Sequence, residues 1–147
     1  MCVLDPFYDK IKSEKEASWR FWMNYLHVKA VEVEEEVATV YLEQELDERL
    51  GKEMKDGERI LVDSDEFAFI YIIEDEEGFY GIRFDEQVWP QLKEGFNKGT
   101  TYFLKLNEMT RLTLAEFNEE MTFLLENIRG NGNYGEAFEQ TVKAMFE

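Results

Sequence analysis

The chain has 147 residues and a formal net charge of −17, because 33 Asp and Glu stand against 16 Lys and Arg. One histidine and one cysteine are too few for the common zinc sites or for an internal disulfide, and the negative charge argues against direct binding to nucleic acid or to an anionic membrane. A hydrophobic fraction of 44% with 15% aromatic residues predicts one compact domain rather than a disordered chain.

The first predicted element is an amphipathic helix from Asp9 to Leu26. Trp19, Trp22 and Met23 recur at helical spacing with Leu26, so they share one face of that helix. Such a stripe more often docks on the sheet of its own chain, and the alternative is a contact with another protein. We therefore take Trp19, Trp22 and Met23 as a candidate interaction surface.

Polarity then alternates with a period of two residues, which is typical of strands. Two valine-rich segments, Val28 to Glu34 and Val37 to Glu43, follow this pattern and flank a charged turn of three glutamates. Apolar residues at four-residue spacing between Gln44 and Gly57 predict a short helix or an ordered loop.

The strongest strand candidates are Arg59 to Val62 and Phe67 to Ile73. The second is apolar throughout, which indicates a strand covered on both faces. A charged turn at Glu74 to Gly78 leads into another strand, Phe79 to Phe84, so these two strands are expected to form a hairpin.

A helix is predicted next, with Asp85 as its N-cap and Gly99 at its end. Pro90 stands deep for a helix start and predicts a distorted first turn. The segment Thr100 to Leu106 then supplies a further strand.

Two consecutive helices are predicted at the C-terminus. Thr113 and Glu116 match a capping box for the first, and Asn133 with Glu136 gives a looser signature for the second. The whole chain predicts an α+β domain, with a mostly antiparallel sheet of about six strands and helices packed on it. Residues 1–26 would be a helical extension, 27–112 mainly sheet with one inserted helix, and 113–147 a helical hairpin.

Two stretches follow a pattern known from bacteria: Leu61-Val62-Asp63-Ser64-Asp65 running into Phe69-Ile70-Tyr71-Ile72, and LENIRGNGNYGE from Leu125 to Glu136. Together with Val28-Lys29-Ala30-Val31 and Trp89, they resemble the YjbL-like family of Bacillus-type bacteria over residues 26–147. That family consists of small acidic proteins without an assigned function. The resemblance implies a cytoplasmic protein of a Gram-positive relative, and it implies no activity.

Two motifs that could bind a ligand have simpler structural readings. The segment from Gly130 to Gly135 matches G-x-G-x-x-G, but a helix precedes it where a dinucleotide site needs a strand, so a tight helix–helix connection is favoured. Asp63-Ser64-Asp65 resembles the start of a calcium loop, yet Phe67 and Ala68 stand where that loop needs an oxygen ligand and a glycine. Asp63 and Asp65 are expected to cap a bend, and a weak ligand or cation site is the alternative.

The favoured function is a non-catalytic protein-interaction or regulatory domain of the bacterial cytoplasm. One alternative is an acidic decoy, in which the runs at 34–36 and 74–77 mimic nucleic acid and occupy a basic protein. The other is a small-ligand or divalent-cation binding domain, or an enzyme, built on Asp63 and Asp65. We assign no catalytic, cofactor-binding or metal-binding residue and expect no cofactor. The expected partner is a protein or a second copy of the chain, with no nucleic acid and no membrane.

Overall fold

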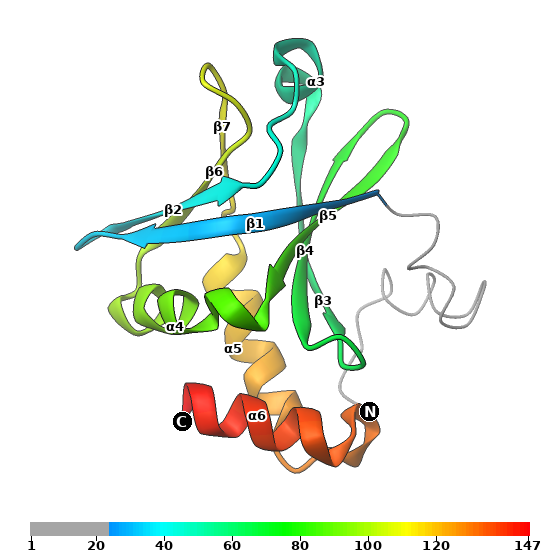
Figure 1. Cartoon of the computed structure of the whole chain (residues 1–147), viewed down its shortest axis with the longest axis vertical. Helices are drawn as coiled ribbons and strands as arrows, with labels where there is room; N and C mark the ends of the chain where they lie inside the picture. Colours follow the sequence, from blue (N-terminus) through cyan, green and yellow to red (C-terminus); the bar gives the residue numbers. More distant parts are fainter. Residues whose placement is uncertain (1–23) are drawn as a thin grey trace.

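The computed structural model describes residues 24–147, in which one seven-stranded sheet curls around a hydrophobic core (Figure 1). The strands lie in the order β3-β4-β5-β1-β2-β6-β7. Their bounds are β1 Asn24–Val33, β2 Val37–Leu42, β3 Lys55–Asp63, β4 Ala68–Asp75, β5 Gly78–Asp85, β6 Thr101–Lys105 and β7 Arg111–Thr113. The helices are α3 Glu48–Glu53, α4 Trp89–Lys98, α5 Phe117–Ile128 and α6 Glu136–Phe146, with 3₁₀ turns at Glu86–Val88 and Gly132–Tyr134.

The α+β class and the two consecutive C-terminal helices are confirmed, but the prediction of a mostly antiparallel sheet is wrong. The sheet is mixed, because β1 runs parallel to β5 and β2 runs parallel to β6. Residues 24–27 of β1 pair with β5, and the residues from Val28 onward pair with β2, with a bulge between Val28 and Ala30. An alternating pattern shows which side of a strand is buried but not which strand lies beside it, so the parallel pairings were not predictable from it.

The predicted helix from Asp9 to Leu26 is wrong at its end, because residues 24–26 begin β1. Tyr25 and Leu26 pair there with Gly81 and Ile82 of β5, and these long-range backbone bonds override the local helical spacing. The remainder of the predicted helix lies outside the described residues, and so do Trp19, Trp22 and Met23.

The apolar segment predicted to be covered on both faces is β4, and its residues 68–73 are all fully buried. Phe69, Tyr71 and Ile73 face the helices and join the main core. In that core the rings of Tyr102 and Phe117 stack with centroids 4.0 Å apart. This packing fixes α5 against the sheet.

The start of α4 follows the distortion that Pro90 predicts. A 3₁₀ turn precedes the helix, which begins at Trp89 with the proline in its first turn. Trp89 is fully buried, and its indole Nε1 donates a hydrogen bond to the Phe84 carbonyl at 3.0 Å, so α4 is anchored to the end of β5. Asp85 flanks this turn but makes no side-chain cap bond.

The two predicted caps of the C-terminal helices are wrong in detail. Thr113 lies in β7, and α5 begins only at Phe117 without a side-chain cap bond. The backbone N–H of Ala115 instead donates to Asp56 Oδ2 at 3.0 Å, which ties this loop to β3. Gly135 stands at the start of α6, with φ of 87°, in place of the predicted Asn133. Among the described helices, none has the length and apolar character needed to cross a membrane.

Candidate functional site

The sheet has a face that packs on the helices and a second face, which we call the outer face. Around β4, the outer face carries Leu61, Ile70 and Ile72, which form a cluster separate from the main core. Side chains alternate along each strand, and the strand registers place four polar residues on this same face: His27, Asp63, Arg83 and Asp85.

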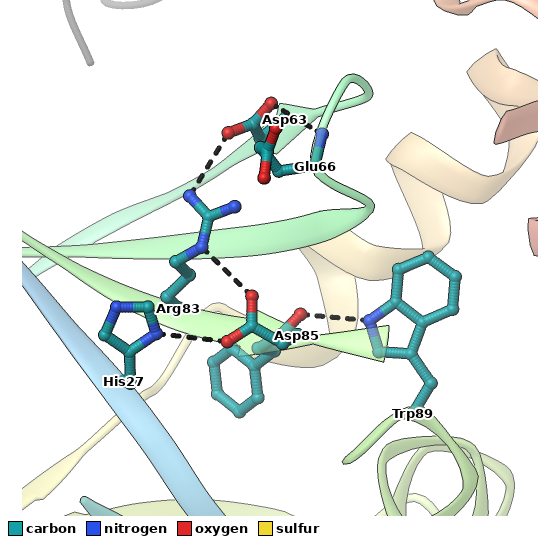
Figure 2. Close-up of polar contacts among 7 residues, drawn as sticks. His27, Asp63, Glu66, Arg83, Asp85 and Trp89 are labelled. Carbon is teal, nitrogen blue, oxygen red and sulfur yellow. Dashed lines mark hydrogen bonds and ion pairs between the residues drawn. The ribbon is translucent and has the colours of Figure 1, made fainter. Parts of the chain in front are cut away.

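These four polar side chains form a continuous chain of contacts across β3, β5 and β1, drawn in Figure 2. Arg83 lies in the middle, with Nη1 3.1 Å from Asp63 Oδ2 and Nε 3.0 Å from Asp85 Oδ1. The second oxygen of Asp85 lies 3.1 Å from His27 Nδ1. We call this arrangement the polar chain.

Local sequence and strand register together build the polar chain. Arg83 and Asp85 are two residues apart on β5, so they share the outer face while Ile82 and Phe84 point into the core. The parallel register sets His27 beside Arg83, and Asp63 ends β3 two strands away from Arg83.

Burial increases steeply from one end of the polar chain to the other. The exposed fraction of the side chain is 49% for His27 and 30% for Asp85, but 9% for Arg83 and 1% for Asp63. A buried carboxylate is tolerated when it is paired and hydrogen-bonded, and Arg83 supplies that pairing. The guanidinium carbon also lies 5.4 Å from the centre of the Tyr25 ring. The inner half of the polar chain is therefore a structural ion pair.

The two residues of the predicted site, Asp63 and Asp65, thus lie in different surroundings. Asp63 Oδ1 accepts a hydrogen bond from the backbone N–H of Glu66 at 3.2 Å, which confirms its role in the bend between β3 and β4. Asp65 lies exposed on that bend. A cation at Asp63 would have to displace Arg83. Within residues 24–147 no group of three or more His, Cys, Asp or Glu side chains is arranged to hold a metal ion.

The predicted helix–helix connection at 130–135 is confirmed, since this segment joins α5 to α6. Asn131 caps the 3₁₀ turn by accepting a bond from the Asn133 N–H, and the N–H of Gly130 donates to Glu139 at 2.6 Å. The connection borders a cavity of about 240 Å³ between the two helices. The polar lining of this cavity includes Glu139 and the ion pair between Arg129 and Glu147.

A second surface feature lies on the exposed strand face of β2, β6 and β7. A shallow hollow of about 430 Å³ is lined by Glu34, Val37, Thr39, Tyr41, Phe103, Lys105 and Arg111. We call it the strand hollow. The registers set Tyr41, Lys105 and Arg111 in one row across the three strands.

Cations and aromatic rings contact each other in the strand hollow. The guanidinium carbon of Arg111 lies 4.5 Å from the centre of the Phe103 ring, and Lys105 Nζ lies 5.6 Å from the centre of the Tyr41 ring. At these distances the positive charge is attracted to the ring face. The hollow therefore gathers two cations in a chain in which acids outnumber cations about two to one.

The two cations of the strand hollow differ in their partners. Lys105 donates to Glu108 at 2.9 Å, and this hydrogen bond raises the pKa of the Lys105 ammonium. The hydroxyl of Tyr41 donates to Glu32 at 3.2 Å, and desolvation followed by the Glu32 charge raises the pKa of that hydroxyl. Arg111 forms no ion pair with another described residue, and its guanidinium contacts the Phe103 ring.

The strand hollow is not among the sites that the sequence predicts. The alternation in β6 does contain a signal, because Tyr102 and Leu104 are buried while Phe103 and Lys105 between them are not. That signal could have marked an outward Phe103–Lys105 pair. Nothing local predicts the three-residue strand β7, which brings Arg111 beside that pair.

Comparison with known proteins places the chain in a family. A family described as "Family of unknown function (UPF0738)" matches residues 26–146. The chain belongs to the UPF0738 family. The predicted YjbL-like resemblance is thereby confirmed, because a UPF0738 protein of Bacillus subtilis named YjbL is 43% identical over 94 residues, covering 64% of this chain and 76% of that protein.

Other UPF0738 proteins match over most of this chain. One from Shouchella clausii is 59% identical over 124 residues, which are 84% of this chain and the whole of that relative. One from Halalkalibacterium halodurans is 42% identical over 124 residues, with 84% of this chain and 98% of the relative covered. No solved structure matches the chain. Both the polar chain and the strand hollow lie within the UPF0738 match, whereas Trp19, Trp22 and Met23 precede it.

Proposed function

We propose that this UPF0738 protein is a non-catalytic interaction domain of the bacterial cytoplasm that binds an acidic segment of a partner protein in the strand hollow. The observation that carries the proposal is the row of Tyr41, Lys105 and Arg111, with Phe103 beneath the guanidinium of Arg111. Arginine, tyrosine and phenylalanine are the residue types enriched in protein interfaces.

The geometry of the hollow favours a protein segment over a reacting substrate. Its walls are strand side chains with two aromatic rings, two cations and the hydroxyl of Thr39, together with Glu34 from the turn after β1. The lining contains neither histidine nor cysteine nor serine. An extended acidic segment could place a carboxylate against Arg111 and apolar groups against Phe103 and Tyr41. Arg111 suits this role because its guanidinium offers a planar set of donors to a carboxylate.

The net charge of the whole protein gives the binding of an acidic partner a distinctive dependence on salt concentration. An acidic partner is repelled at long range by a chain of charge −17, and salt screens that repulsion. The attraction to Arg111 acts at short range and is screened less once water is excluded. Binding is therefore expected to survive an increase in salt, whereas binding of a basic partner to the acidic surface would weaken.

Affinity capture from a lysate of a related bacterium, at low and high salt, tests the proposal. The wild type is compared with Arg111→Glu and Tyr41→Ala, and with Phe123→Ala as a control on the exposed face of α5. The expected result is one protein retained by the wild type and by the control at both salt concentrations, and lost from both hollow variants. Equal capture by all four chains would contradict the assignment to the hollow.

The acidic decoy is the second candidate, and one cluster of acids supports it. Glu116, just before α5, is raised in pKa chiefly by repulsion from Glu119 of that helix, and also by the charges of Glu58 and Asp56 of β3. Acids from separate elements thus converge on one surface, as a mimic of phosphate spacing requires. The capture experiment separates the two candidates, because a decoy would retain basic proteins at low salt and release them at high salt.

A further inference from the structure

The cavity between α5 and α6, which we call the α5–α6 cavity, has an apolar floor. Its volume of about 240 Å³ lies just below the range of about 300–1,000 Å³ that is typical of pockets for drug-sized ligands. The hydrophobic side chains that line it come equally from the two helices: Leu125 and Ile128 from α5, Val142 and Phe146 from α6. Ile128 and Val142 are buried, and the other two are half-buried. The floor therefore offers apolar surface to a small ligand.

Aromatic packing holds one wall of the cavity in place. The centre of the Phe146 ring lies 5.8 Å from the centre of the Trp89 ring and 6.0 Å from that of Phe69. Both of these partners are fully buried in the main core. If Phe146 turned into the cavity to fill it, it would give up both contacts. Protein interiors are normally close-packed, so an unfilled space fixed in this way is a feature that needs an explanation.

Charged side chains surround the opening of the α5–α6 cavity. Arg129 follows the last residue of α5, and its Nε lies 3.2 Å from Oε2 of Glu147, which follows the last residue of α6. Lys143, one helical turn before Glu147, adds a second cation to the lining and forms no ion pair with another described residue. Glu139 already accepts the hydrogen bond from the Gly130 N–H. The opening thus presents two cations above an apolar floor.

The contact between Arg129 and Glu147 indicates which head group this opening accommodates. Glu147 places a carboxylate on the guanidinium at the edge of the cavity. The two side chains are 64% and 41% exposed, and an exposed pair of this kind contributes little to stability. The carboxylate of a ligand could therefore replace that of Glu147 at small cost. A ligand would in addition bury its apolar chain on the floor, which the short side chain of Glu147 does not do.

We infer that the α5–α6 cavity binds a short monocarboxylate, with its carboxylate on Arg129 and its apolar chain on the floor. A water molecule takes up about 30 Å³ of the liquid, and a methylene group is of similar size, so the cavity suits a ligand of about six to eight carbons. A second carboxylate on the chain would be buried on the floor without a partner, which is costly. An amine in place of the carboxylate would be repelled by Arg129 and Lys143.

A titration of the isotope-labelled full chain with butanoate, hexanoate and octanoate, at constant ionic strength, tests the inference by nuclear magnetic resonance. The amide signals of Ile128, Gly130 and Val142 around the cavity are expected to shift. The amides of Thr39 and Phe103 in the strand hollow are the control and are expected to stay in place. Burial of a methylene raises affinity about fourfold, so octanoate is expected to bind about sixteenfold more tightly than hexanoate.

Two variants test the recognition of the head group. Arg129→Gln is expected to weaken octanoate about fivefold and to leave the binding of octan-1-ol unchanged, and Glu147→Gln is expected to strengthen octanoate by up to about fivefold because its carboxylate no longer competes. Arg49→Gln and Glu126→Gln make the same changes in net charge at exposed positions outside the cavity lining. Both controls are expected to bind octanoate as the wild type does.

Each failure of these expectations has a distinct meaning. Unshifted amides at Ile128, Gly130 and Val142 in millimolar octanoate would overturn the assignment of the cavity as a ligand site. Equal affinities for butanoate and octanoate would show that the chain does not enter the cavity. If Glu147→Gln behaved like Glu126→Gln, Arg129 would not be the carboxylate site. The α5–α6 cavity and the strand hollow share no lining residue, so these outcomes are independent of the proposed function.

Discussion

Arg83 Nη1 lies 3.1 Å from Asp63 Oδ2, and this ion pair is almost entirely removed from water between β5 and β3. Asp63 depends on Arg83, since its carboxylate alone would be buried without compensation, whereas Arg83 has a second ion pair with Asp85. Because Arg83 belongs to β5 and Asp63 to β3, this ion pair ties the two strands together across β4.

Arg83→Met is expected to lower the free energy of unfolding by about 3–5 kcal/mol, because it leaves Asp63 as an uncompensated buried charge. Urea denaturation followed by circular dichroism measures the loss. Arg129→Met is the matched control: its ion pair with Glu147 is exposed, and such pairs contribute about 0–1 kcal/mol. The double variant Asp63→Asn with Arg83→Met should recover part of the stability. Equal losses for Arg83→Met and Arg129→Met would contradict the reading of a buried pair.

Gly95→Ala is expected to destabilise the protein although alanine is the better helix former. A Cβ at Gly95 in α4 would lie 2.5 Å from Tyr102 Oη and 3.1 Å from Thr100 Oγ1. The clash disturbs the hydrogen bond from Tyr102 Oη to the Leu92 carbonyl, and overpacking of this kind costs about 1–3 kcal/mol. Gly132→Ala is the control, since a Cβ there has open space. A melting temperature unchanged by Gly95→Ala would show that α4 shifts freely on the sheet.

The buried tyrosines are expected to make the fold sensitive to alkali. Burial raises the pKa of Tyr71 and Tyr102 above the ordinary value of 10.0, and for Tyr71 the hydrogen bond to Asp56 acts in the same direction. The unfolded tyrosines ionise near pH 10 and the folded ones do not, so this contribution is complete below pH 10 and declines as the pH rises above it.

Absorbance at 295 nm and circular dichroism, recorded in parallel from pH 8 upward, check this expectation. Ionisation of the two buried tyrosines should coincide with unfolding, while the solvent-accessible Tyr41 ionises separately. Tyr71→Phe should raise the pH at which half of the protein is unfolded, after correction for the change that the substitution makes in stability at neutral pH. Full ionisation of all tyrosines in a chain that stays folded would refute the burial argument.

Glu119→Gln is expected to raise the melting temperature at pH 7 and low salt. Glu119 is the main source of the repulsion that raises the pKa of Glu116. A raised carboxyl pKa means that protonation of Glu116 favours the folded state, so the folded state loses stability as the pH rises through that pKa. The gain should shrink at high salt and at acidic pH. Glu94→Gln should have the opposite sign, because Glu94 pairs with Lys98 along α4. A gain of equal size at every salt concentration would mean that the effect is not electrostatic.

Local patterns were sufficient for the elements that depend on neighbours in the chain. The apolar segment before Glu74 forms the buried residues 68–73 of β4, Pro90 marks the irregular start of α4, and the glycine-rich segment at 130–135 joins two helices. Each of these follows from the side chains of one segment: their size, their period or their backbone preference.

Local patterns gave the wrong element where a distant strand competes with a local signal. Leu26 continues a helical stripe, yet it pairs with Ile82 in a strand. Thr113 stands in a capping-box motif, yet it pairs with Phe103 in β7. In both cases backbone hydrogen bonds to a strand far along the chain outweigh the local preference.

The sequence by itself determined that this is an acidic α+β domain, that the apolar segment before Glu74 is a buried strand, and that Asp63 stands at a bend. Only the tertiary structure decided that Asp63, Arg83, Asp85 and His27 meet, and that Arg111 lies over Phe103. The physical reason is the period of the strand: it specifies which side chains point outward, but the neighbour of each outward side chain is set by strand order and register. Those depend on the packing of the whole sheet.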